Sequence, residues 1–402
     1  MRGESSTLES EYPGRRATTM AACATVIAVL PVFLLGALAI QLEADLGMTT
    51  PVLGAAAATF WAVSALLSSC GGWVVERLGS KSGLLISTAL GLVALGGTAM
   101  ASPEWPWLFL WLSIAAASNA LAHPASNGLI VSQVSAGKRG LAFGLKQMSV
   151  PGAALTAGLS VPLLAVTLGW RWPFAIAAIY ATVLLTALVR AAGPRNVPVL
   201  PTVSSVQAQM PRKHYLFLLT TAIAAGLGSA PASALGAFTV VSAAGLGFEP
   251  VTAGLILVLG SVAGCLVRPL VGLAADRGVG GSMSTVALMM AIGGAGLALM
   301  ATGVPAVFSV GCLLAFGFGW GWAGLIHFVI SRRSHAYMAR ASGMAQSGAY
   351  LGGIGGPIAF GLLFSGPGPT AAWASAAAVA GAGAAAAAVA YRLEQDLPES
   401  TC

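Results

Sequence analysis

Long apolar runs alternate with short polar intervals over almost the whole chain. A helix needs about 20 apolar residues to cross a bilayer. The runs are continuous rather than alternating every second residue, which favours helices over membrane strands. The predicted spans are residues 19–42, 51–75, 82–102, 106–134, 140–168, 171–192, 213–242, 250–275, 282–302, 304–331, 338–366 and 369–391. The pattern predicts an all-α membrane protein with twelve transmembrane helices.

Composition supports a membrane protein. Hydrophobic residues make up 57% of the chain and charged residues only 8%, whereas a soluble domain carries about 25% charged residues. The net charge of +7 falls in short clusters between apolar runs, with no basic stripe interleaved with aromatics, so no nucleic-acid partner is expected. The expected partners are the lipid bilayer and a small-molecule substrate.

The placement of basic residues predicts the orientation. Residues such as Arg77, Lys138 and Arg332 fall at the N-terminus, after even-numbered spans or at the C-terminus. The opposite loops hold Arg171 as their one basic residue, and they carry acidic residues such as Glu43. By the positive-inside rule, we expect both termini to lie in the cytoplasm and the protein to be a multi-pass protein of the cell membrane.

The sequence repeats itself at an offset of about 200 residues. The segment 72–77 after span two matches 272–277 after span eight, and 144–147 in span five matches 343–346 in span eleven. Such parallel repeats are typical of secondary transporters, with the substrate site where the halves meet. The predicted division is an N-terminal tail (1–18), a six-helix bundle (19–192), a linker (193–212), a second six-helix bundle (213–391) and a C-terminal tail (392–402).

The repeated segments resemble the G-x-x-x-D-R-x-G-R-K signature of the major facilitator superfamily. The matching residues are Gly72, Glu76, Arg77, Gly79 and Lys81 in the first half, and Gly272, Asp276 and Arg277 in the second. The resemblance implies the fold of that superfamily, a monomer, and a motif that gates alternating access. We expect both leading glycines to permit close helix contact.

Two cations lie inside predicted spans, one in each half. Lys146 is seven residues beyond Arg139, and Arg268 is eight residues before Asp276, which places them about 10 and about 12 Å inside at 1.5 Å per residue. No Asp or Glu lies within any apolar span. A buried charge needs compensation, so we hypothesise that an anionic substrate bridges Lys146 and Arg268. In the alternative, both side chains extend to the interface, or Arg268 pairs with Asp276.

The segment beginning Arg268-Pro269 also resembles the eighth helix of monocarboxylate transporters, whose Arg contacts the substrate carboxylate. Those proton-coupled carriers have an Asp one turn before the Arg, where this chain has Gly264. The resemblance favours a carboxylate substrate, and the missing Asp puts the same proton coupling in doubt.

Polar and aromatic residues on the helices expected to line the cavity complete the predicted binding site. Asn119, His123 and Asn127 share one face of span four, and Asn119 is expected to tie helices together. A histidine could also carry a proton. The other candidates are Gln147 in span five, Trp320 and His327 in span ten, and Gln346 and Tyr350 in span eleven.

An exporter of amphipathic drugs or secondary metabolites, driven by proton antiport, is the alternative function. The aromatics and the many small residues favour it. The Arg that such exporters carry in span four and their G-P-x-x-G-G pattern in span five are missing. A non-transporting receptor or scaffold is disfavoured because no sizeable soluble domain is present. The chain has no P-loop and no clustered metal ligands, so we expect no enzyme activity, cofactor or metal.

Overall fold

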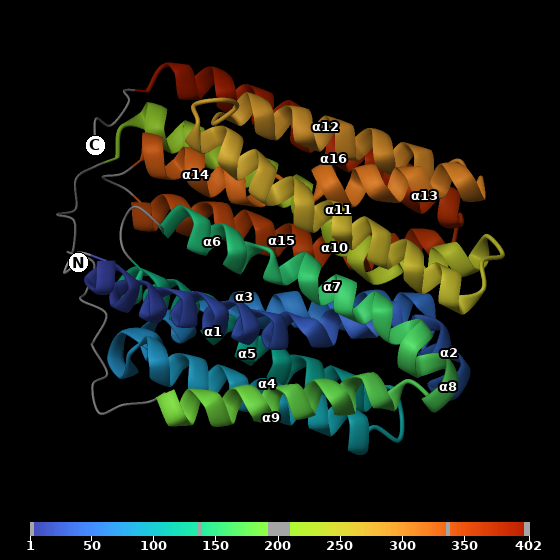
Figure 1. The fold of residues 1–402 in the computed structure, drawn as a ribbon. Coiled ribbons are helices and arrows are strands. Elements are labelled where there is room, and N and C mark those ends of the chain that lie inside the picture. Colours follow the sequence, from blue (N-terminus) through green and yellow to red (C-terminus); the bar gives the residue numbers. More distant parts are fainter. Residues whose placement is uncertain (1–3, 135–138, 192–209, 335–337, 398–402) are drawn as a thin grey trace.

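The computed structural model describes residues 4–134, 139–191, 210–334 and 338–397. Figure 1 shows a bundle of long helices that run roughly side by side, with the first helix beginning and the last helix ending at the same end of the bundle. We call this end the terminal face and the opposite end the distal face. Within the described residues, 12 helices are long and apolar enough to cross a membrane.

The spans follow the chain in order. They are formed by α1 (Glu4–Ala37) with α2 (Ala39–Leu46); α3 (Thr50–Leu78); α4 (Ser80–Met100); α5 (Pro106–Gln133); α6 (Arg139–Gln147) with α7 (Ser149–Ser160), the π-helix η2 (Val161–Ala165) and α8 (Val166–Leu168); α9 (Arg171–Ala191); α10 (Arg212–Gly245); α11 (Pro250–Asp276); α12 (Met283–Met300); α13 (Pro305–Leu314) with the π-helix η3 (Ala315–Gly319) and α14 (Ala323–Arg333); α15 (Met338–Ser365); and α16 (Pro369–Gln395).

The predicted all-α architecture of twelve spans in two six-helix bundles is confirmed, with differences at helix ends and with spans five and ten interrupted within their length. Helix α1 begins at Glu4 and α16 continues to Gln395, so both helices extend into the segments predicted as tails. Continuing a helix past the apolar segment moves its unpaired end groups out of the apolar region to where water can bond them, and the charged residues there are good helix formers. Most of the predicted linker, residues 193–209, lies outside the described residues.

The core is continuous between the halves near the distal face. One cluster of buried apolar residues joins α1, α3 and α5 to the distal parts of α10, α13 and α16. The terminal part of the second half forms a separate cluster around Met289 and Ile326. The two halves therefore share a core at the distal face.

Glycines bring the backbones of the two halves into contact near the distal face. A side-chain carbon at Gly36 would collide with the backbone of Ala237, and one at Gly54 would collide with the carbonyl of Pro357. Gly158 on α7 is likewise in tight contact with α11. Side chains larger than hydrogen would push the halves apart at all three places, so the distal end of the interface is closed.

The terminal halves of the same interface helices are free of such contacts. Gly72 on α3, Gly144 on α6, Gly272 on α11 and Gly343 on α15 have no atom within 4 Å of where a side-chain carbon would lie. The expectation of close helix contact at Gly72 and Gly272 is therefore wrong for this conformation. The physical reason is that the helices diverge towards the terminal face, and the glycine of α3 in close contact is instead Gly71, against Ala120.

Candidate functional site

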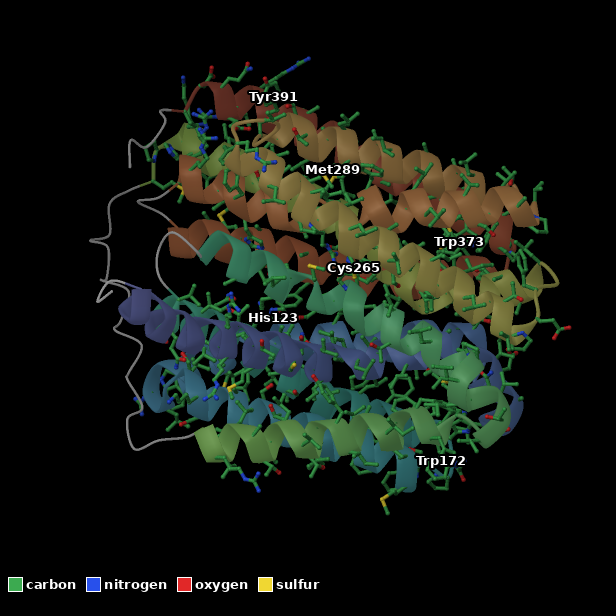
Figure 2. All side chains as sticks on the ribbon, viewed as in Figure 1. His123, Trp172, Cys265, Met289, Trp373 and Tyr391 are labelled. Carbon is green, nitrogen blue, oxygen red and sulfur yellow. The ribbon has the colours of Figure 1, made fainter. Side chains whose placement is uncertain are left out.

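Buried Lys146 and half-buried His123 form a pair in the first half. Lys146 lies in the last turn of α6 with only 3% of its surface exposed. Its Nζ is 2.9 Å from Nδ1 of His123 on α5. An ammonium group has donors only, so a charged Lys146 requires Nδ1 to be the unprotonated nitrogen of the ring. Figure 2 shows His123 between the two faces of the bundle.

Arg268 on α11 makes its hydrogen bonds to backbone carbonyls. Its guanidinium donates to the carbonyl of Trp320 at 2.9 Å and, across the two halves, to the carbonyl of Gln147 at 3.5 Å. The guanidinium carbon also lies 5.5 Å from the centre of the Trp320 ring. Within the described residues, neither Arg268 nor Lys146 has a carboxylate partner. The side chain of Asp276, the partner of Arg268 in the alternative interpretation, lies outside the described residues.

Both carbonyls are available because their helices are interrupted. In a regular helix the carbonyl of Gln147 would accept from residue 151, but that residue is Pro151 and has no N–H. The second interruption is a turn at residues 320–322, where Gly321 donates to Phe318 and Leu325 donates to Trp322. The two interruptions therefore leave one carbonyl in each half for the half-buried Arg268.

His327 on α14 belongs to the same site. It lies within electrostatic range of both Lys146 and His123. His327 of the second half therefore lies close to the two basic groups of the first half, and Arg268 of the second half reaches the residue next to Lys146, at the carbonyl of Gln147. These groups concentrate hydrogen-bond donors and positive charge, and no carboxylate of the described residues contacts them. Such a site is suited to binding an anion.

Trp320 forms an apolar wall beside these groups. Its ring centre is 5.5 Å from that of Phe33 on α1 and 5.6 Å from that of Phe316 in η3. Phe33 comes from the first half, so the aromatic group also crosses the interface. Phe33 was not a candidate in the sequence because a Phe within an apolar run carries no distinguishing pattern.

The other predicted site residues are spread more widely. Asn127 is exposed, one turn nearer the terminal face than His123 on α5. Gln147 contributes its backbone carbonyl to Arg268. Gln346 lies within hydrogen-bonding reach of Tyr350 on α15, and the structure gives neither a contact with the cations. Asn119 is fully buried and donates to Ser64 on α3, as expected of a residue that ties helices together.

The predicted gating motif is visible mainly in its turns. Gly79 joins α3 to α4 with a φ of 83°, and Gly278 follows α11 with a φ of 80°, a conformation that favours glycine. Arg77 stacks 4.2 Å from the ring of Trp73, Lys81 lies in the first turn of α4, and Arg277 caps α11. The side chains of Glu76 and Asp276 lie outside the described residues.

The comparisons with known proteins decide the family. A family model described as Major Facilitator Superfamily matches residues 21–357. The chain belongs to this superfamily. Members of the superfamily are transporters, so this is a multi-pass membrane transporter.

Solved structures agree at the level of the fold. The crystal structure of a D-xylose–proton symporter superimposes with a TM-score of 0.74 over 95% of this chain and 97% of that one, at 18% sequence identity. At this identity the likeness establishes the fold alone. No curated protein matches the sequence.

Proposed function

We propose that this transporter moves a small organic anion, a carboxylate, across the cell membrane by alternating access. The observation that carries the proposal is the pair of cations inside the bundle, the buried Lys146 from the first half and the half-buried Arg268 from the second. An anion bound between them would supply the compensating negative charge that no described residue provides beside these cations. It would also contact both halves, so its binding would favour their movement together.

The surroundings of the cations support a substrate with both a charged and an apolar part. His123 and His327 offer further hydrogen bonds to an anionic group. The Trp320 ring, held against Phe33 and Phe316, offers an apolar surface. A small carboxylate with a short carbon chain fits this combination.

The conformation supports access from the terminal face. Glycine contacts close the distal end, whereas four glycines of the interface helices stand uncovered towards the terminal face. Asn127, on the face of α5 that carries His123, is exposed there. Under the positive-inside rule the terminal face is cytoplasmic, which makes this the inward-open state of the cycle.

A sugar substrate, suggested by the D-xylose–proton symporter, has less support. Sugars are neutral and would leave Lys146 and Arg268 without a compensating charge. At 18% identity the binding residues of that symporter have no necessary counterparts here.

Counterflow in proteoliposomes tests the proposal. Vesicles preloaded with unlabelled lactate, pyruvate, succinate or oxalate would be diluted into the labelled form of the same anion. We expect saturable counterflow of at least one of them, lost in Lys146→Gln. Lys213→Gln is the matched control, because Lys213 is an exposed lysine at the terminal end of α10. Absence of counterflow for every anion would overturn the proposal.

A groove on another side of the protein favours the alternative of an exporter for amphipathic compounds. It measures ≈ 940 Å³ and is lined almost wholly by apolar residues of α10, α15 and α16, among them Ile223, Leu351 and Val379. Neither cation belongs to its lining. Efflux of a lipophilic dye that persists in Lys146→Gln and fails in Leu351→Trp, together with no anion counterflow, would support this function.

A further inference from the structure

The Lys146–His123 pair poses a question of charge that the anion proposal leaves open. The two nitrogens are 2.9 Å apart, with the lysine buried and the histidine half-buried. Their hydrogen bond accounts for one proton between them, carried by the lysine while Nδ1 of His123 accepts it. If His123 also took up a proton there, two positive groups would face each other without water or an acceptor between them. Like charges at this distance disfavour each other strongly when buried.

A neighbouring histidine makes a second proton still less favourable. His327 on α14 faces the pair from the second half, within electrostatic range of both members. Arg268 on α11 reaches the carbonyl of the next residue, Gln147, and has the thiol of Cys265 beside it. Among the described residues, no carboxylate contacts the pair.

A carboxylate placed at the pair would reverse this balance. One oxygen can accept from the Lys146 ammonium and the other from an imidazolium at His123, which replaces the hydrogen bond between the two side chains by two charge-assisted ones. Anion binding and protonation would then favour each other, as linkage requires when each ligand improves the site for the other.

We propose that the Lys146–His123 pair is the proton-coupling site, taking up one proton on His123 for each carboxylate bound, so that the protein is a proton–anion symporter. The inference rests on the anion transport proposed above. The charges balance. The empty site carries Lys146 and Arg268 as cations, while the loaded site adds one imidazolium and one carboxylate. Empty and loaded carriers thus have the same net charge, and the transport cycle is electroneutral.

The closing experiment uses proteoliposomes of the full chain and the carboxylate that gives the fastest counterflow. A pH gradient, acid outside, should drive accumulation of that anion above its external concentration. An internal pH dye should report one proton entering per anion. A membrane potential set by potassium and valinomycin should leave the accumulation ratio unchanged, because the full cycle moves no net charge.

Variants then locate the proton. In His123→Gln, counterflow should continue at a lower rate while accumulation under the pH gradient is lost, because glutamine can donate to the anion but cannot carry the proton. His214→Gln is the matched control, because His214 on α10 is bonded to the backbone carbonyl of Arg333 and lies outside the binding site; it should retain accumulation. His327→Gln tests the other histidine of the site as the alternative proton carrier.

The outcomes separate this inference from the proposed function. Net uptake of the anion by the wild-type protein without proton entry, or an accumulation ratio that follows the membrane potential, overturns the coupling, and persisting counterflow leaves anion transport standing. Loss of accumulation in His327→Gln rather than His123→Gln overturns the assignment to this pair. Absence of any anion counterflow contradicts the proposed function itself.

Discussion

Arg268 donates a hydrogen bond of 2.9 Å to the backbone carbonyl of Trp320. The same guanidinium reaches the carbonyl of Gln147 in the other half at 3.5 Å. A half-buried arginine is thus stabilised by two carbonyl dipoles rather than by a carboxylate. Carbonyls are weaker partners than a carboxylate, so an entering anion can displace them. We interpret these two hydrogen bonds as the contacts that Arg268 makes in the empty transporter and exchanges for the substrate.

Replacing Arg268 by Lys and by Gln should separate charge from geometry. Lysine keeps the charge but lacks the fork that reaches two carbonyls or grips a carboxylate with two bonds. We expect Arg268→Lys to lower kcat/KM for anion counterflow by about tenfold and Arg268→Gln by about a hundredfold or more, in keeping with the cost of losing hydrogen bonds to charged groups. Equal activity of Arg268→Gln and the wild type would show that the cation has no part in transport.

Pro151→Ala should weaken the contact between Arg268 and Gln147. Alanine restores the N–H that a regular helix directs to the carbonyl of Gln147. The carbonyl of Gln147 would then no longer compete with the substrate for Arg268. We expect KM for the anion to fall by about two- to tenfold, which is less than the full energy of a hydrogen bond to a charged group because this contact is long. Pro231→Ala, at a proline within α10, is the control. A rise in KM for Pro151→Ala alone would contradict this role of the proline.

The glycines of α3 allow a test of the closed distal end. Gly54 is in contact with Pro357 of the other half, whereas Gly72 on the same helix has no neighbour within 4 Å. We expect Gly54→Leu to force the distal ends apart and Gly72→Leu to leave this conformation intact. Spin labels on the distal ends of α1 and α10 would report the separation. An unchanged distance in Gly54→Leu would argue against tight closure there.

A buried carboxylate at the terminal end of the second half should contribute to stability. Glu394 is 2% exposed, accepts from the backbone N–H of Met283 at 2.8 Å and pairs with Arg333 at 3.4 Å. Glu394→Gln should lower the free energy of unfolding by about 1–3 kcal/mol, seen as a lower Tm in detergent. Asp396→Asn, which removes an exposed 3.9 Å contact with Lys213, should change the Tm little. Similar losses in both variants would contradict this assignment.

The sequence predicts the fold well because apolar runs and clusters of basic residues are local features of the chain. The twelve spans follow from them. Lys146 and Arg268 could also be found, since a cation in an apolar run stands out. The contact between Lys146 and His123 could not be predicted, because it depends on how α5 and α6 pack. The carbonyl of Trp320 is a backbone group and leaves no trace in residue identity. The free carbonyl of Gln147 could have been recognised from the sequence, because Pro151 stands four residues later and has no N–H to bond it.

The glycine contacts show another limit. Gly71 and Gly72 are adjacent in the sequence, and only the rotation of α3 decides that Gly71 packs against Ala120 while Gly72 stands free. The signature in the sequence marks glycines that matter over a whole transport cycle. A single conformation can leave them uncovered.

Equilibrium binding in a double-mutant cycle tests most directly whether one anion contacts both cations. Binding of the best-transported labelled carboxylate would be measured for the wild type, Lys146→Gln, Arg268→Gln and the double variant. We predict that each single change weakens binding at least about tenfold, and that the double variant loses clearly less than the product of the two, because both side chains hold one carboxylate. Unchanged affinity in either single variant, or losses that simply multiply, would contradict an anion bound between Lys146 and Arg268.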